Sequence, residues 1–234
     1  MPTWLRLAEG PVFRFALAVL LLGLFRLAAL SLWGMAASIR RAGDRRIPYL
    51  ELLVETLGWL FPVARLHRTR RFYSYASFAF HLGILAAGLF LANHLEILHA
   101  NTGIRWAAMR KPVLDALTLV TFIAGGYLLL HRIYVASSRR LSKASDYLLL
   151  VVILNIFGSG FLAGRGWNPL PYDGLMLFHT LNGVLLMLVI PFTKIAHCVL
   201  FPVIRLASEA AWHLTPRGGS ETIRTLYGPE GRKI

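Results

Sequence analysis

The chain has 234 residues, of which 56% are hydrophobic and only 15% are charged, and its mean hydropathy is +0.59. A soluble domain carries about a quarter charged residues. The composition therefore excludes a soluble domain and indicates an integral membrane protein. The formal net charge of +14 does not indicate a nucleic-acid partner, because the basic residues cluster in short loops beside apolar segments, as membrane-topology signals do. The one cysteine, Cys198, excludes disulfides within the chain, zinc sites built from several thiolates and self-ligated iron–sulfur clusters.

Five apolar segments are long enough to cross a bilayer, which takes about 20 residues of α-helix. They cover residues 12–34, 72–98, 113–135, 146–164 and 174–202. We expect helices, because an unpaired backbone amide in lipid is very unfavourable. The sequence therefore predicts an all-α integral membrane protein with five transmembrane helices. Residues 1–206 form the membrane domain, with an amphipathic segment at 47–66 on the inner surface, and residues 207–234 form a polar C-terminal tail.

Lys and Arg residues set the expected orientation. The loops after the first and third spans are strongly basic, whereas the other two loops carry few basic residues. The loops after the first and third spans contain Arg40, Arg41, Arg45, Arg46, Arg65, Arg68, Arg70, Arg71, Arg139, Arg140 and Lys143. The positive-inside rule then places the N-terminus outside and the C-terminus in the cytoplasm. The first apolar segment is too long for the hydrophobic region of a signal peptide, so we interpret it as a membrane anchor.

The second and fifth spans carry four histidines, His81, His94, His179 and His197. His179 and His197 are eighteen residues apart, which is five turns of α-helix, so we expect both on one face and about 27 Å apart. The second span runs the opposite way, with His81 towards the cytoplasmic half and His94 towards the outer side. Facing each other, the two spans present one histidine pair at each of two depths. Bis-histidine ligation of haem iron needs this arrangement.

Alternatives to this interpretation follow from the same residues. On an ideal helix His81 and His94 are offset by about 140°, whereas His99 shares the face of His81 and is an alternative to His94. We favour His94 because it lies at membrane depth. Membrane histidines also serve as packing residues or proton relays, so a proton-coupled transporter and a non-redox membrane anchor are the alternative functions. Zinc fits less well, because its ligands converge in one small tetrahedral shell.

Several short motifs follow one another along the spans. They are “FHLGI” at 80–84, “GGYLLLHR” at 125–132, “SDYLLL” at 145–150 and “PFTKIAH” at 191–197, the last closing an H-x17-H spacing. In order and spacing they resemble the gamma (cytochrome b) subunit family of respiratory nitrate reductase. “FLANH” at 90–94 and “DALTL” at 115–119 resemble more closely the membrane haem b subunits of sulfate-reducer-type transmembrane redox complexes, which pair with iron–sulfur proteins of heterodisulfide-reductase type.

This resemblance implies two haem b groups. His81 and His197 match the ligands of the inner haem, and His179 matches a ligand of the outer haem. The position that carries its partner in nitrate reductase holds Leu91 here. The sulfate-reducer relatives imply that His94 replaces that partner. If neither His94 nor His99 ligates iron, the protein carries a single haem.

We therefore predict an electron-transfer subunit of a quinone-linked respiratory complex in the bacterial cytoplasmic membrane, with no catalysis of its own beyond quinol oxidation or quinone reduction. The resemblance implies exchange with menaquinone or ubiquinone near the outer haem, where Lys111 and Asp115 are candidates, although an aspartate that stabilises a helix dipole is the simpler interpretation. Arg26, Arg132 and Lys194 are candidates to pair with the propionates of the inner haem. The expected partners are a cytoplasmic iron–sulfur subunit, docked on the basic loops, and a periplasmic multihaem cytochrome c.

Overall fold

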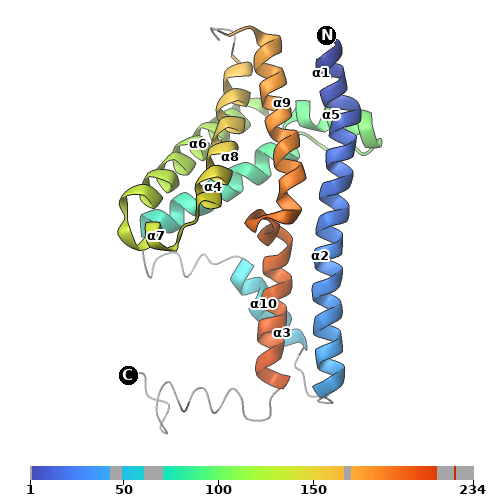
Figure 1. Ribbon diagram of the computed structural model, residues 1–234, viewed down its shortest axis with the longest axis vertical. Coiled ribbons are helices and arrows are strands. Elements are labelled where there is room, and N and C mark those ends of the chain that lie inside the picture. The colour runs from blue at the N-terminus through green and yellow to red at the C-terminus, as the bar shows by residue number, and fades with distance from the viewer. Residues whose placement is uncertain (1, 43–48, 61–70, 166–169, 215–223, 225–234) are drawn as a thin grey trace. The chain divides into compact units, whose positions relative to one another are not determined.

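The computed structural model describes residues 2–42, 49–60, 71–165, 170–214 and 224 (Figure 1). Over these residues the chain is helical and contains no strand. Five of the described helices are long and apolar enough to cross a membrane: Thr3–Arg41, Arg71–Phe90, Lys111–Tyr134, Ala144–Ala163 and Tyr172–Phe192. The prediction of an all-α, multi-pass membrane protein is confirmed, whereas the orientation and the type of membrane stay predictions.

The first span is continuous through three elements, α1 (Thr3–Leu7), the π-helical turn η1 (Ala8–Val12) and α2 (Phe13–Ala42). Pro11 lies inside η1, and since proline has no N–H to donate, the wider turn accommodates it. The later elements are α3 (Tyr49–Leu60), α4 (Arg71–Phe90), α5 (Ala92–Thr102), α6 (Lys111–Tyr134), α7 (Ala136–Leu141), α8 (Ala144–Ala163), α9 (Tyr172–Val189), the 3-10 turns η3 (Ile190–Phe192) and η4 (Lys194–Ala196), and α10 (His197–Leu214).

The chain divides into two compact units, of which the first combines Met1–Val19 with Ala64–Val189. Within it α4 packs on α6, α6 on α8 and α8 on α9. Small residues bring these backbones close together. A Cβ atom added at Gly83 would lie 1.5 Å from the Oγ1 of Thr121, and one added at Gly125 would lie 2.7 Å from the ring of Phe80. Glycine at these two positions is what allows close packing of α4 and α6 in the absence of a hydrophobic drive between helices in lipid.

The second span ends earlier than expected. The predicted helix over 72–98 is wrong beyond Phe90, because Leu91 is extended (φ −74°, ψ 126°) and α5 begins at Ala92. The loop after α5 folds back on this break: Trp106 donates its Nε1–H to the carbonyl of Leu89 at 2.7 Å, and the Met109 amide donates to Phe90 at 2.9 Å. These bonds satisfy carbonyls that the end of α4 leaves without helical partners.

The fifth span is also interrupted. The predicted helix over 174–202 is wrong past Val189, because the chain passes through η3 and η4 before α10 begins at His197. Pro191 lies in η3, and Thr193 is extended (φ −126°, ψ 177°). A proline cannot supply the helical N–H and so favours the break. His179 and His197 therefore lie on different helices, and the five-turn argument that put them on one face does not hold.

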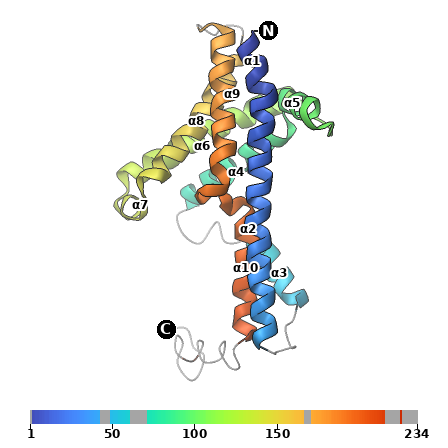
Figure 2. The same ribbon diagram turned by 45° about the vertical axis from the view of Figure 1, so that its right-hand side comes forward.

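The second unit combines Leu20–Val63 with Ile190–Ile234, and α3 lies beside α10 in it (Figure 2). Leu52 and Ala210 form its buried core, with Ile39 and Leu206 packed against them. A Cβ atom added at Gly23 would lie 2.5 Å from the Cβ of Pro191, so α2 and η3 are in close contact. Since α10 continues to Leu214, the first part of the predicted tail is helical. Most of the remaining tail lies outside the described residues.

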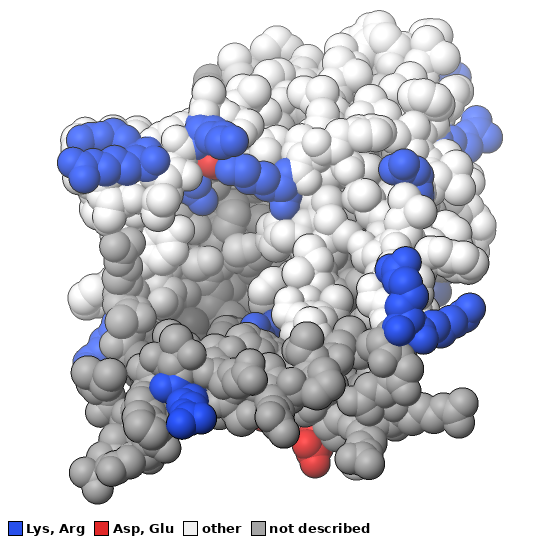
Figure 3. All heavy atoms as spheres, turned by 60° about the horizontal axis from the view of Figure 1, so that its bottom comes forward, with Lys and Arg blue, Asp and Glu red and all other residues white. Residues whose placement is uncertain are grey.

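Basic side chains dominate the charged surface that the structure describes. In the view of Figure 3, Lys and Arg atoms form several patches, whereas Asp and Glu atoms are scarce. This agrees with the 25 Lys and Arg residues against 11 Asp and Glu in the sequence. Several of the arginines on which the orientation depends, including Arg45 and Arg65, lie outside the described residues.

Candidate functional site

His94 on α5 and His179 on α9 face each other within the first unit. Their ring centres are 6.0 Å apart and their planes are inclined by only 16°. The Nδ1 of His94 lies 2.9 Å from the carbonyl oxygen of Ala87, and the Nδ1 of His179 lies 3.1 Å from that of Ile156. A carbonyl can only accept, so each Nδ1 carries the proton. In the neutral rings the lone pair that can bind a metal is then on Nε2, which bonds to no other described residue in either ring.

The break at Leu91 is what brings His94 into this position. On an uninterrupted helix His94 would be offset by about 140° from the face of His81. Because α5 starts again after an extended residue, its side chains no longer follow the phase of α4. His99, the alternative ligand, instead lines a separate cavity of about 580 Å³ together with Glu96, Arg105 and Trp106. The structure therefore places His94 opposite His179 and His99 elsewhere.

Helix α8 supplies the wall behind His179. The Oγ of Ser159 lies 3.2 Å from the Nδ1 of His179, and Ser159 is buried, with 5% of its surface exposed. A Cβ atom added at Gly160 would lie 2.7 Å from the Cε1 of the same imidazole. The hydroxyl of Ser159 donates to the carbonyl of Asn155 at 2.6 Å, so its oxygen is oriented to accept from Nδ1. Together these contacts fix the rotation of the His179 ring.

Burial disfavours the charged form of His94. His94 lies in α5, outside the five candidate spans, and burial lowers its pKa below the ordinary histidine value. The neutral ring is the form that binds metals.

The distance between the two ring centres can be compared with the distance expected for two imidazoles that bind one metal ion. A metal–imidazole bond is about 2 Å long and the ring centre lies about 1 Å behind the nitrogen, so two imidazoles on opposite sides of one ion have ring centres about 6 Å apart. The ring centres of His94 and His179 are separated by 6.0 Å, in a stacked arrangement with planes 16° apart. No group of three or more His, Cys, Asp or Glu that could hold a metal occurs among the described residues.

The predicted inner pair, His81 and His197, falls in different units, so the structure does not relate the two residues. The Nδ1 of His81 lies 2.7 Å from the carbonyl of Ser77, and the Nδ1 of His197 lies 2.8 Å from that of Lys194. Both imidazoles thus have the same kind of backbone contact as His94 and His179. Their pairing stays a prediction.

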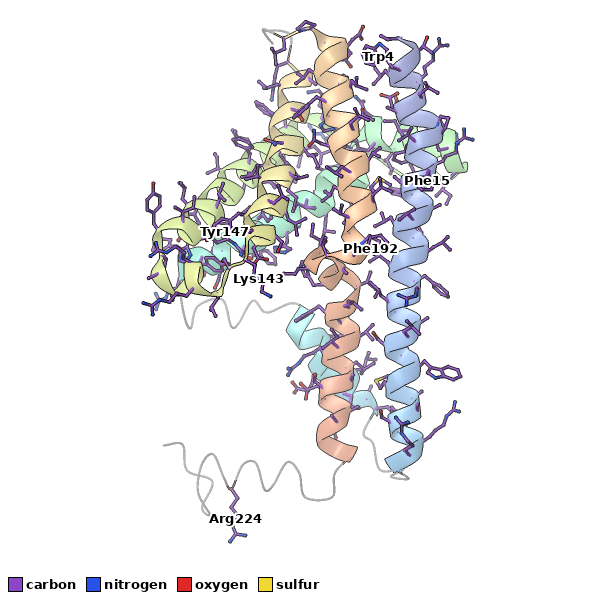
Figure 4. The ribbon with its side chains drawn as sticks, viewed as in Figure 1. Trp4, Phe15, Lys143, Tyr147, Phe192 and Arg224 are labelled. Atoms are coloured by element: carbon purple, nitrogen blue, oxygen red, sulfur yellow. The ribbon has the colours of Figure 1, made fainter. Side chains whose placement is uncertain are left out.

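The three predicted propionate partners have different surroundings. Arg132, at the end of α6, donates from Nη1 to the Oγ of Ser142 at 3.3 Å, and its Nε is buried without a hydrogen-bond partner among the described residues. The backbone carbonyl of Arg132 accepts from the hydroxyl of Tyr147 at 3.1 Å, and Figure 4 shows Tyr147 in α8 near Lys143. Arg26 is exposed and has no ion pair with any described residue. Lys194 begins η4.

The predicted quinone residues form an ion cluster. The Nζ of Lys111 lies 2.8 Å from the Oδ2 of Asp115, and the guanidinium of Arg165 lies 3.4 Å from the same oxygen. Arg165 also stacks on the ring of Phe161, 4.4 Å from its centre. Two cations hold one carboxylate near the N-terminus of α6, which fits the simpler, structural interpretation of Asp115.

Ser159 and Gly160 are not among the residues predicted from the sequence. They lie in “FGSG” at 157–160, a run of small residues that is a signal for close helix approach. Periodicity alone did not connect that run with His179, because the contact is between two helices.

Comparison with known proteins gives little further information. No protein-family model matches the chain, and no solved structure matches it. A curated protein of Nitratidesulfovibrio vulgaris (strain Hildenborough), named only “Protein”, is 36% identical over 146 residues. The matched region is 62% of this chain and 64% of that relative, so the chain spans less than two thirds of the relative's length.

Proposed function

We propose that this protein is a haem b-binding membrane subunit that passes electrons between the quinone pool and a cytoplasmic iron–sulfur subunit of a respiratory complex. The observation that carries the proposal is the His94–His179 pair, with parallel rings 6.0 Å apart and both Nδ1 atoms bonded to backbone carbonyls. Haem supplies one-electron chemistry, in which iron alternates between the ferrous and ferric states. The chain contributes the axial ligands and the apolar surroundings.

Each residue of the site has a separate task in this function. His94 and His179 would hold the iron through Nε2, and the carbonyls of Ala87 and Ile156 keep the proton on Nδ1 of each ring. Such partners of ligating histidines also raise the basicity of the ligand. Gly160 leaves room for the His179 ring.

A second haem is held by His81 and His197 in this proposal. Its support is the family resemblance together with the backbone contacts of both Nδ1 atoms. Arg132, whose Nε lacks a partner among the described residues, is suited to a propionate, because a buried guanidinium N–H without a partner is unfavourable. Arg26 and Lys194 are the further cations of this site.

Electrons enter or leave through quinone and protein partners. Menaquinone or ubiquinone would bind in the region of Lys111 and Asp115, close to the site where His94 and His179 would hold the outer haem. The basic loops dock a cytoplasmic iron–sulfur subunit, and a periplasmic multihaem cytochrome c docks on the opposite side. The subunit acts in the bacterial cytoplasmic membrane and has no catalysis of its own beyond reaction with quinone or quinol.

An absorption spectrum of the purified protein, before and after dithionite reduction, tests the proposal. A bis-histidine haem b gives a reduced band at about 560 nm, and we expect two haems per chain. His94→Ala should remove one of them, whereas His99→Ala, a matched change on the same helix, should keep both. His81→Ala should remove the other.

The alternatives give different results. A transporter that uses the histidines as proton relays, or a non-redox anchor subunit, shows no such band, and its absence in wild-type protein would refute the proposal. One haem in the wild type that survives His94→Ala and is lost in His81→Ala would leave only the inner site. Loss of haem in His99→Ala but not in His94→Ala would overturn the ligand assignment.

A further inference from the structure

A cavity of about 580 Å³ lies between α5 and the loop that returns from it, within the first unit. Glu96 and His99 line it from α5, and Arg105 and Trp106 line it from the loop. The other lining residues are apolar, namely Ala92, Leu95, Ala107 and Ala108. A volume of this size, an apolar wall and a few polar groups are typical of sites for small organic ligands.

This cavity is separate from the histidine pair. On α5, Glu96 and His99 lie about 140–160° around the helix axis from His94. The His94 ring faces His179, with ring centres 6.0 Å apart, so the cavity lies on the other side of α5. What binds there is therefore independent of the proposed haem and quinone sites.

Both walls of the cavity are held in place by other parts of the first unit. The Nδ2 of Asn101, near the end of α5, donates to the carbonyl of Glu9 at 2.8 Å. Gly103 then adopts a left-handed conformation (φ 75°) that turns the chain back. On the returning loop, Trp106 donates its Nε1–H to the carbonyl of Leu89 at 2.7 Å. The walls are thus formed before any ligand binds, which lowers the entropic cost of binding.

The cavity carries two opposite charges that no described residue neutralises. The carboxylate of Glu96 and the guanidinium of Arg105 both line it and are exposed, and neither makes an ion pair or hydrogen bond with any described residue. The charges at the start of α6 differ, because Lys111 and Arg165 both bind Asp115. A negative and a positive group that share a cavity without bonding to each other suit a ligand that lies between them.

These charges limit the class of ligand. A metal ion fits poorly, because Arg105 repels a cation and the described residues contain no group of three or more His, Cys, Asp or Glu that could hold one. A simple anion fits poorly, because Glu96 repels it. A zwitterion suits both sides: its anionic group accepts hydrogen bonds from Arg105 and His99, and its ammonium group donates to Glu96. The planar guanidinium of arginine matches the oxygens of a phosphate.

The position of the cavity indicates the source of such a zwitterion. One candidate span ends at Phe90 and the next begins at Lys111, so α5 and its loop connect two spans at one boundary of the membrane. Trp106 lies in this connection, and tryptophan is enriched at the level of the lipid headgroups. Phosphoethanolamine is a lipid headgroup that carries both a phosphate and a primary ammonium group.

We propose that the cavity between α5 and residues 105–108 binds the phosphoethanolamine headgroup of a membrane lipid. Arg105 and His99 bind the phosphate, and Glu96 binds the ammonium group. The site is distinct from the haem and quinone sites of the proposed function.

The test is competitive lipid retention by the full-length protein, measured by native mass spectrometry. The purified protein is mixed in detergent with equal amounts of dioleoyl phosphatidylethanolamine, phosphatidylcholine and phosphatidylglycerol. We expect phosphatidylethanolamine to be retained at least about threefold over each of the others, the effect of one exposed ion pair. Phosphatidylcholine has a methylated ammonium group that cannot donate a hydrogen bond, and phosphatidylglycerol has no cation for Glu96.

Two variants change the two charges separately. Glu96→Gln should remove the preference over phosphatidylglycerol, and Arg105→Ala should reduce the retention of all three lipids at least about threefold. Glu51→Gln and Arg110→Ala are the matched controls, because each makes the same change at an exposed position outside the cavity. Both should retain the lipids in the wild-type order. All four changed side chains are exposed, so the folded protein is kept.

Equal retention of the three lipids by the wild type would overturn the inference. A preference for phosphatidylethanolamine that survives both Glu96→Gln and Arg105→Ala would also overturn it, because the headgroup would then bind elsewhere. Displacement of the lipid by an equal concentration of water-soluble glycerophosphoethanolamine would show a site for a soluble zwitterion and refute the lipid as its source.

Discussion

Adding one methyl group at position 160 should disturb the His94–His179 pair without removing a ligand. In Gly160→Ala the new Cβ would lie 2.7 Å from the Cε1 and 3.1 Å from the Nδ1 of His179. Carbon atoms in contact are normally about 3.7 Å apart, so the ring must move by about 1 Å. Overpacking of this kind costs about 1–3 kcal/mol, which corresponds to roughly 5- to 150-fold weaker retention of the outer haem.

The assay is the haem-to-protein ratio of the purified variant, and the rate at which its haem transfers to an excess of apomyoglobin. Gly183→Ala is the control, because it adds the same methyl group to α9 at a position with no atom within 4 Å. We expect Gly183→Ala to match the wild type and Gly160→Ala to lose one haem faster. Equal rates of haem loss in the two variants would refute the role assigned to the close contact between α8 and His179.

Three further changes test other parts of the structure. Ser159→Ala removes the oxygen beside the Nδ1 of His179, so the ligand becomes less electron-donating and the reduction potential of one haem should rise in an optical redox titration; an unchanged potential would contradict the contact. Leu52→Ala should destabilise the second unit by about 2–5 kcal/mol, because the Leu52 side chain is buried, with 4% of its surface exposed. The control is Leu53→Ala, since Leu53 is 50% exposed. The thermal unfolding midpoint of Leu52→Ala should be lower than that of Leu53→Ala. Lys111→Ala breaks an exposed ion pair that contributes less than about 1 kcal/mol, so the thermal unfolding midpoint should equal that of the wild type. Haem reduction by quinol should be slower than in the wild type. A wild-type rate would exclude Lys111 from the quinone site.

The helix class and most span limits could be predicted because they depend on local composition. The segment predicted at 113–135 is α6, Lys111–Tyr134, and the one at 146–164 is α8, Ala144–Ala163. Bilayer thickness and the need to pair every backbone amide leave little freedom in such elements. The prediction succeeded where the lipid, not the rest of the chain, determines the structure.

The two helix breaks differ in how visible they are in the sequence. Pro191 marks the second break directly, since proline removes a helical donor, and the predicted helix over 174–202 ignored it. The first break falls at Leu91, a good helix former with no proline beside it. Its causes lie elsewhere in the chain, in the bonds from Trp106 and Met109 to the end of α4. No local pattern could have revealed it.

The break at Leu91 determines which histidine of α5 faces His179. Helical phase counted against His94 and in favour of His99, since His99 shares a face with His81 on an ideal helix. That comparison presupposes one continuous helix through both residues, and the extended Leu91 removes it. After the break, His94 meets the ring of His179 at 6.0 Å while His99 lines another cavity. The position of His94 is therefore set by the returning loop at 103–110, and which histidine faces His179 depends on tertiary contacts that periodicity cannot represent.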